Sequence, residues 1–256
     1  MLEGAVLATT AADLARVVAT GQRLVVVHGG GPQATALSQR LGLTPQLVGG
    51  RRVTDAPTLD VMKMIVAGQL NVDLVTALRA VGVAAVGIAG TSGLVRARRR
   101  PPRVVAGGGP APVDFGLVGD VIGFDLSLLA AFRAGGFTPV VASLGLDEAG
   151  GALNINADVV ASQLAAALGA ACLVAVTAVG GVRRDRDDPA TRIARLTVAE
   201  ARAEIAAGRV KGGMIPKLEE AFVPLEAGVG AVLIVAPGEV AAALAAAGSV
   251  GTVLGP

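Results

Sequence analysis

Three glycines follow a short apolar segment near the N-terminus, and they form the first candidate site for chemistry. Residues 24–27 are Leu-Val-Val-Val, and His28–Gln33 reads HGGGPQ before a helix-compatible run. Glycine lets backbone N–H groups approach an anion, and the positive end of a following helix dipole attracts negative charge. The pattern indicates a site for a carboxylate or a phosphate. A tight strand–helix turn that binds no ligand would have the same sequence pattern.

Two other nucleotide-binding patterns fit this segment less well. Gly29, Gly31 and Ala34 match the spacing GxGxxA, but the next acidic residue is Asp55, which follows a Gly-Gly-Arg-Arg run rather than a second strand. No GxxxxGK[ST] phosphate loop occurs in the sequence. His28 is the only histidine, and a structural role is favoured for it, so the chemistry should not need a histidine base.

Cationic and polar side chains in three further segments could act on an anionic substrate. Lys217 falls in the first turn of an expected helix, where the dipole disfavours a cation unless an anion lies nearby. Structural readings stay open: Arg52 as a surface charge, Asn154 as a turn residue, and Asp158 as a neighbour of a helix N-cap. The segments are Gly50–Thr54 (GRRVT), Asn154–Asp158 (NINAD) and Gly212–Lys217 (GGMIPK).

Composition limits the classes of function. The chain has 256 residues, a length sufficient for one large α/β domain or two lobes. Hydrophobic residues make up 53% of it and aromatic residues 2%. A net charge of +2 does not indicate nucleic-acid binding. The basic run 96–103 lacks aromatic partners and is expected in a solvated hairpin or loop, with a lid facing an anionic substrate as the alternative.

Cysteine usage and hydropathy favour a cytoplasmic protein. Cys172 is the single cysteine, which predicts a buried, inert thiol and suits a reducing compartment. No signal peptide is expected, because the N-terminal segment has no basic region. The stretch Val159–Val182 carries no charge, but it is expected to form a helix and a strand of a core rather than a membrane span.

Helical and strand patterns alternate, which predicts a mainly parallel sheet covered by helices on both faces. A long helix should run from a cap at Thr54 or Asp55 to about Ala80, broken near Gly68, and 93–121 should form hairpins and loops. Ligands should bind beyond the carboxyl ends of the strands. Other helices are expected at 11–19, 33–41, 126–134, 157–168, 198–207, 213–227 and 239–246, and strands at 24–27, 83–88, 138–142, 173–177 and 231–235.

The four motifs, in this order and spacing, resemble the acetylglutamate kinases of the amino acid kinase family. Gly145 after the run 139–141 and the closing residues 251–253 fit the same pattern. The resemblance implies an α/β three-layer sandwich with a central, mainly parallel sheet, in a carbamate kinase-like fold with two lobes. Residues 1–155 would then bind the acyl amino acid and dimerise, and residues 156–256 would bind ATP.

By this resemblance the reaction is ATP-dependent phosphorylation of the γ-carboxylate of N-acetyl-L-glutamate, a step of arginine biosynthesis. Mg²⁺ would arrive with the nucleotide, no protein metal ligands are expected, and a cytoplasmic homodimer is implied. A carboxylate nucleophile is already ionised at neutral pH, so no general base is needed. The resemblance implies that the N–H groups of Gly30 and Gly31 donate to the reacting oxygens, that Arg52 clamps the α-carboxylate, and that Asn154 fixes the substrate. Lys217 would neutralise the charge of the phosphoryl group, and Asp158 would orient that lysine. The nucleotide would be contacted by Thr177, Gly180, Gly213 and Met214.

The sequence departs from the family pattern in three places, one of which is Gly90–Gly93, where an acidic residue before the last glycine would be usual. The family opens with a strand ending in Lys-x-Gly-Gly, and residues 1–4 look like those just after it; a start internal to the natural reading frame is favoured over loss of that lysine. Ala178 stands where an acidic residue is usual. Two alternatives therefore stay open: a carrier-protein-linked aminoadipate or glutamate kinase of lysine biosynthesis, and a catalytically dead paralogue acting as a sensor or partner subunit. Feedback inhibition by arginine is not expected.

Overall fold

A computed structural model describes residues 4–105, 108–185, 188–210 and 212–255. Residues 1–3 lie outside this part of the chain. They belong to the segment that looked like the residues just after the family's Lys-x-Gly-Gly strand. Contacts divide the protein into two units. Unit 1 combines the chain up to Gln22 with the chain from Ala161 onward, and unit 2 is Arg23–Val160. The expected division of substrate and ATP binding between two lobes stays a prediction.

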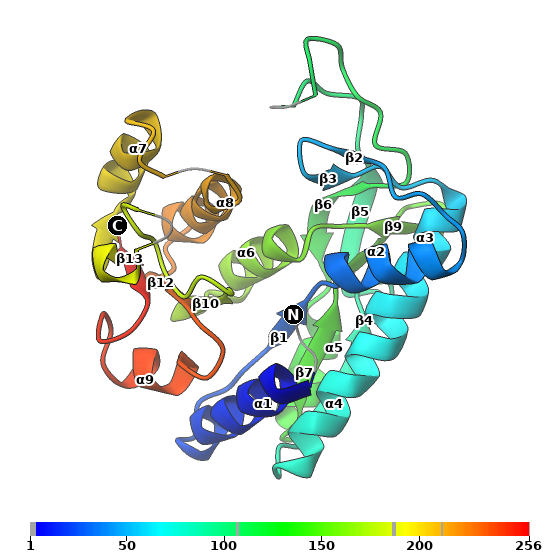
Figure 1. The fold of residues 1–256 in the computed structure, drawn as a ribbon. Helices are drawn as coiled ribbons and strands as arrows, with labels where there is room; N and C mark the ends of the chain where they lie inside the picture. Colours follow the sequence, from blue (N-terminus) through cyan, green and yellow to red (C-terminus); the bar gives the residue numbers. More distant parts are fainter. Residues whose placement is uncertain (1–3, 106–107, 186–187, 211, 256) are drawn as a thin grey trace. The chain divides into compact units, whose positions relative to one another are not determined.

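Unit 2 is built on a three-stranded parallel sheet, in the order β1-β7-β4. The central strand β7 is buried along its whole length, as expected for a parallel strand covered on both faces. Figure 1 shows the long helical segment that ends in α4 running alongside these strands. The elements are β1 (Val26–His28), α2 (Gly31–Arg40), α3 (Ala56–Met62), α4 (Asn71–Ala80), β4 (Ala85–Ala89), α5 (Ser127–Ala134) and β7 (Thr138–Ala142).

The predicted break of the long helix near Gly68 is wrong. Helical structure is continuous from Ala56 to Ala80, and residues Lys63–Leu70 form a π-helix, η1, between α3 and α4. Buried side chains of η1, among them Val66 and Leu70, pack into the core, and this packing outweighs the low helix propensity of glycine. A π-helical turn is rare and is often found at functional sites.

The long helix begins where the sequence predicted. Asp55 is the N-cap of α3, and its Oδ1 accepts a hydrogen bond from the Thr58 N–H at 2.9 Å. Hydrogen bonds from Thr58 lower the pKa of this carboxyl. The helix is long and apolar enough to cross a membrane by length and composition alone, but the core helix of a soluble protein meets the same criteria, and both Leu74 and Leu78 are buried.

A second sheet of unit 2 has the order β6-β5-β8-β9. β5 and β6 pair antiparallel, which confirms the hairpin expected within 93–121. The basic run lies on this hairpin: Arg99 contacts Asp114 at 2.8 Å and Arg100 contacts Asp120 at 2.7 Å. The short strands β2 and β3 form a separate hairpin. The elements are β2 (Leu47–Val48), β3 (Arg51–Arg52), β5 (Val95–Arg99), β6 (Gly119–Phe124), β8 (Leu144–Leu146) and β9 (Ala152–Asn154).

Unit 1 contains a mixed sheet in the order β10-β12-β13-β11, where β12 and β13 are antiparallel and the other pairs are parallel. The charge-free stretch from Val159 divides into α6 and β10, as predicted, and burial raises the pKa of the Cys172 thiol in β10. The helix α6 (Ala157–Leu168) begins in unit 2 and enters unit 1 at Ala161. The other elements of unit 1 are α1 (Gly4–Ala19), β10 (Cys172–Val176), η2 (Pro189–Thr191), β11 (Arg195–Thr197), α7 (Val198–Ala206), α8 (Met214–Glu226), β12 (Ala231–Val235), α9 (Val240–Ala245) and β13 (Thr252–Gly255).

The closing Gly-Thr pair of the family pattern has a structural role here. Gly251 has φ +60° and packs against the carbonyl oxygen of Ile234, where a side chain would collide. The Thr252 hydroxyl donates to the Ile193 carbonyl at 2.6 Å and accepts from the Val182 N–H at 2.8 Å. These residues fix the loops around β13.

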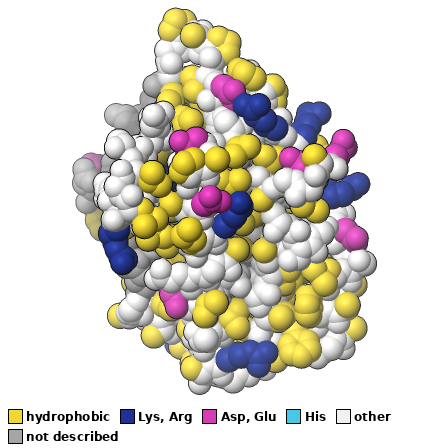
Figure 2. Space-filling view, turned by 90° about the vertical axis from the view of Figure 1, so that its right-hand side faces the viewer, with side chains coloured by type: hydrophobic (Ala, Val, Ile, Leu, Met, Phe, Trp, Pro, Cys, Tyr) yellow, Lys and Arg dark blue, Asp and Glu magenta, His cyan; other side chains and the backbone are white. Residues whose placement is uncertain are grey.

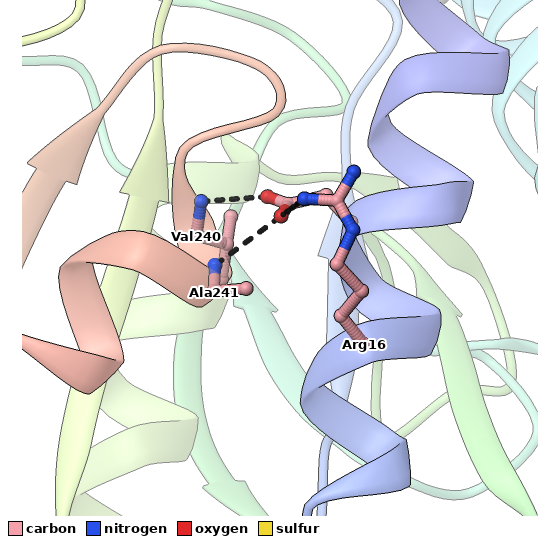
Figure 3. Close-up of polar contacts among 4 residues, drawn as sticks. Arg16, Val240 and Ala241 are labelled. Carbon is pink, nitrogen blue, oxygen red and sulfur yellow. Dashed lines mark hydrogen bonds and ion pairs between the residues drawn. The ribbon is translucent and has the colours of Figure 1, made fainter.

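A buried carboxylate joins the first helix to the last one within unit 1. Asp13 of α1 has no exposed surface, and its Oδ2 accepts from the Val240 N–H at 2.6 Å. Its Oδ1 lies 3.4 Å from both the Ala241 N–H nitrogen and Nη1 of Arg16 (Figure 3). Asp13 therefore satisfies N–H groups at the start of α9, which lack partners within the helix.

We expect Asp13→Ala to lower the free energy of unfolding by about 1–3 kcal/mol, because buried N–H groups lose their acceptor. In thermal denaturation this corresponds to a Tm lower by about 3–10 °C. Asp60→Ala is the matched control, since Asp60 only pairs with Lys63 on the surface, with side chains 60% and 47% exposed, and its Tm should change little. Equal losses in both variants would contradict the capping role.

Candidate active site

The glycine loop joins β1 to α2, as the sequence predicted. β1 ends at His28, Gly30 is the N-cap of α2, and the helix begins at Gly31. The N–H groups of Gly30 and Gly31 have no partner within the helix because they stand at its start. No side chain of the N-cap residue satisfies them. They can therefore serve as donors to an anion.

Packing explains two of the three glycines. A Cβ on Gly30 would lie 2.5 Å from Cδ1 of Leu70, and one on Gly29 would lie 3.1 Å from Cβ of Ala157. A Cβ on Gly31 would meet nothing within 4 Å. A side chain at Gly30 would thus force Leu70 to move and one at Gly29 would be tightly packed, whereas a side chain at Gly31 would meet open space.

Arg52 reaches the glycine loop from the β2–β3 hairpin. Its Nη2 donates to the Gly31 carbonyl oxygen at 2.9 Å and to the Thr35 hydroxyl at 2.6 Å. Its Nη1 is buried and has no hydrogen-bond partner in the described part of the chain. Partial burial lowers the pKa of the guanidinium, yet arginine remains charged at neutral pH. A buried cationic donor without an acceptor is costly unless an anion binds to it.

A second contact ties the arginine hairpin to the NINAD segment. The amide Nδ2 of Asn154, at the end of β9, donates to the Thr54 hydroxyl at 3.1 Å, and both side chains are buried. The glycine loop touches the same segment through Gly29 and Ala157. Unit 2 therefore brings together three of the four sequence motifs: His28–Gln33, Gly50–Thr54 and Asn154–Asp158.

The remaining predicted catalytic residues lie at the first turns of two helices. Asp158 is in the first turn of α6, in unit 2, and its N–H donates to Oδ1 of Asn156 at 3.1 Å. Lys217 is half-buried in the first turn of α8, in unit 1. The orientation of Lys217 by Asp158 stays a prediction.

The residues predicted to contact the nucleotide all lie in unit 1. Thr177 follows β10, and its hydroxyl and carbonyl oxygens both accept from the Gly180 N–H at 3.2 Å. Gly180 has φ +68°, which favours glycine at this turn. Gly213 is the exposed N-cap of α8 and offers no side-chain cap, while Met214 packs against the core of unit 1. The start of α8 thus suits a phosphate.

Two threonines support the site. Thr54, which closes the GRRVT motif, holds Asn154, whereas Thr35, which holds Arg52 and donates to the Gly31 carbonyl at 3.1 Å, belongs to none of the four motifs. The spacing of Thr35 from Gly31, four residues along α2, is the single hint, because residues four apart share a helix face. Among the described residues, no group of three or more His, Cys, Asp or Glu could hold a metal ion.

Known proteins are similar in sequence to this chain over nearly its whole length. Residues 2–236 match the amino acid kinase family. The acetylglutamate kinase of Anaeromyxobacter dehalogenans is 56% identical over 95% of this chain and 92% of its own. The acetylglutamate kinase of Sorangium cellulosum is 54% identical over 99% of this chain and 90% of its own.

The carbamate kinase of Giardia superposes with a TM-score of 0.70 at 17% identity, covering 97% of this chain and 90% of its own. At that identity the likeness concerns the fold alone, and it confirms the predicted α/β fold class. The chain belongs to the amino acid kinase family, and within it to the acetylglutamate kinases.

Proposed function

We propose that this enzyme transfers the γ-phosphoryl group of ATP to the side-chain carboxylate of N-acetyl-L-glutamate. The products are N-acetyl-L-glutamyl 5-phosphate and ADP, and the reaction is a step of L-arginine biosynthesis. The observation that carries the assignment of the acceptor site is the buried Nη1 of Arg52, which has no acceptor among the residues that the structure describes. It lies on the side chain that the glycine loop and Thr35 hold in place.

The acceptor would bind to unit 2 through two sets of donors. Arg52 is assigned to the α-carboxylate, because a guanidinium fork matches the geometry of a carboxylate and a lysine does not. The amides of Gly30 and Gly31 are assigned to the reacting carboxylate and the phosphoryl oxygens. Asn154, held by Thr54, is assigned to the substrate's amide or carboxylate.

The phosphoryl donor would bind to unit 1. Thr177, Gly180, Gly213 and Met214 are assigned to the nucleotide, and the uncapped start of α8 suits its phosphates. Lys217 would neutralise negative charge on the transferred group, with Asp158 as the residue that orients it. Mg²⁺ bound to the phosphates of ATP would reduce their repulsion of the incoming carboxylate.

The chemical step needs no proton transfer. A γ-carboxylate oxygen forms the new bond to phosphorus, and the bond from phosphorus to the bridging oxygen of ADP breaks. Because the nucleophile is already ionised, the protein contributes by positioning and by electrostatic stabilisation. His28, the single histidine, then has no part as a base. This agrees with its burial at the end of β1.

We also assign the enzyme to the cytoplasm and infer a homodimer formed through its N-terminal half. Hydrophobic side chains gather in patches on the face shown in Figure 2. The long helix carries Met64 and Val72, whose side chains are 55% and 56% exposed. A homodimer would cover such side chains where they join into a contiguous apolar patch, since large apolar patches mark interaction surfaces whereas singly exposed side chains do not.

The experiment that tests this function measures ADP release by the purified chain with ATP and Mg²⁺, in the presence and absence of N-acetyl-L-glutamate. Hydroxylamine trapping of the acyl phosphate identifies the product. We expect ADP and hydroxamate to form together and only with N-acetyl-L-glutamate, and not with glutamate or aspartate. Calorimetric binding of N-acetyl-L-glutamate without turnover would overturn the proposal in favour of a sensor, and turnover only with a carrier-linked substrate would favour the other kinase.

A further inference from the structure

A buried network of side chains lies beneath the glycine loop. Nδ2 of Asn71, the first residue of α4, lies 3.0 Å from the Val140 carbonyl oxygen and 3.0 Å from Nε2 of His28. Nδ1 of His28 lies 3.1 Å from the carbonyl oxygen of Gly29. Both side chains are buried, and all of these groups belong to unit 2.

The network fixes the position of the proton on the histidine ring. The Val140 carbonyl can only accept, so the Asn71 atom beside it is the amide nitrogen, which donates. The same nitrogen faces Nε2 of His28, so Nε2 must accept and the ring proton must be on Nδ1. That Nδ1–H then donates to the Gly29 carbonyl. Burial lowers the pKa of His28, which keeps the ring neutral.

The bond to the Gly29 carbonyl acts on the next amide. The C=O of Gly29 and the N–H of Gly30 belong to one planar peptide group, and the described chain contains no cis peptide bond. In a trans peptide these two groups point in opposite directions. A hydrogen bond that holds the Gly29 carbonyl toward His28 therefore points the Gly30 N–H away from the core, as a donor to a ligand requires.

Neighbouring elements are shaped around Asn71. Gly87 of β4 lies so close to Oδ1 of Asn71 that a Cβ there would collide with it. Leu70, Ile65 and Val66 of the π-helix η1 pack over Gly30. The last residue of η1 and the first residue of α4 thus serve the same loop, because Leu70 contacts Gly30 and Asn71 contacts His28.

We propose that Asn71 and His28 are positioning residues that orient the Gly30 amide toward the reacting oxygens of the substrate. Asn71 selects the Nδ1–H form of His28, and His28 holds the Gly29–Gly30 peptide. The kinetic part of this inference rests on the proposed function, whereas the state of His28 does not.

The protonation state of His28 can be read directly, because the chain has one histidine. In protein labelled with ¹⁵N-histidine, the two ring nitrogen shifts should show a neutral ring with the proton on Nδ1. Asn71→Leu should convert the ring to the Nε2–H form or to a mixture of the two. Gly87→Ala should cause the same change by displacing the Asn71 side chain. An Nε2–H or a charged ring in the unaltered protein would overturn the proposal, whatever the enzyme's substrate.

Kinetics test the second step. Asn71→Leu and His28→Gln should lower kcat with N-acetyl-L-glutamate by about 10- to 100-fold, the scale of a misplaced donor, while the KM for ATP stays within about twofold. His28→Asn should retain more activity than His28→Gln, because the amide nitrogen of Asn takes the place of Nδ1. Circular dichroism and Tm identify any variant that has not folded. Equal losses in the folded Asn and Gln variants would contradict the proposal.

Discussion

Lys217→Ala should abolish measurable phosphoryl transfer, with kcat falling by about 10³-fold or more. Removal of a single preorganised donor from the developing charge costs about 10²–10³-fold in other enzymes, and cations aimed at a transferred phosphoryl group are worth still more. In this chain the lysine lies at the first turn of α8. A cation there opposes the helix dipole unless an anion offsets it. The measurement is kcat for ADP release with saturating ATP and N-acetyl-L-glutamate.

Lys63→Ala is the matched control for this experiment. Lys63 begins η1 and forms a surface ion pair with Asp60, so its removal should leave kcat within about twofold. Lys217→Arg keeps the charge but not the compact ammonium group, and we expect partial activity. A folded Lys217→Ala enzyme with more than a tenth of the original kcat would show that the phosphoryl charge is stabilised elsewhere.

Long, strongly patterned elements were predictable from the sequence alone. The strands 138–142 and 231–235 and the helix 157–168 have the bounds that the sequence predicted. Each is mostly apolar and has turn residues beside it, so local sequence and tertiary packing agree. The strands β8 and β9 could not be predicted, because each has three residues and depends on pairing with a distant partner.

The π-helix could not be predicted for a related reason. Gly68 lowers the helix propensity of its segment, which suggested a break, but the neighbouring Ile65, Val66 and Leu70 are all buried. Contacts with the glycine loop decide the geometry of this segment. Gly145, which belongs to the family pattern, is likewise explained only in three dimensions, because a Cβ there would lie 2.5 Å from Ile155.

The sequence pointed to Arg52, Gly30 and Asn154 through motifs, and their roles in the site stay predictions. It did not point to the residues that contact some of them. Thr35 and Asn71 were missed, since each acts on a partner far along the chain: Thr35 lies 17 residues from Arg52, and Asn71 lies 43 residues from His28. A sequence pattern reports periodicity and local spacing, and such contacts leave no mark on either.

Arg52→Ala should raise the KM for N-acetyl-L-glutamate by about 10²- to 10³-fold. Two charge-assisted hydrogen bonds to a carboxylate contribute roughly 3–4 kcal/mol together, and each 1.4 kcal/mol corresponds to a factor of ten in affinity. The KM for ATP should change little, because the nucleotide is assigned to unit 1. The measurement is a full set of initial rates over both substrates. Arg52→Lys should recover only part of the loss, because an ammonium group cannot contact Gly31, Thr35 and a carboxylate in one fork.

Two neighbouring substitutions separate the clamp from the general positive charge of the hairpin. Arg51 precedes Arg52 on β3, and successive strand residues face opposite sides. Arg51→Ala therefore removes the same charge without touching the site and should leave the KM for N-acetyl-L-glutamate unchanged.

Thr35→Val removes one of the two partners that hold Nη2 of Arg52 while leaving Arg52 present. It should raise the KM for N-acetyl-L-glutamate by about 3- to 10-fold, the scale of one hydrogen bond. Thr35→Ser restores the hydroxyl and should restore the KM. If Arg51→Ala and Arg52→Ala raised the KM equally, the hairpin would attract the substrate by its charge alone, and the buried Nη1 of Arg52 would not be the group that binds it.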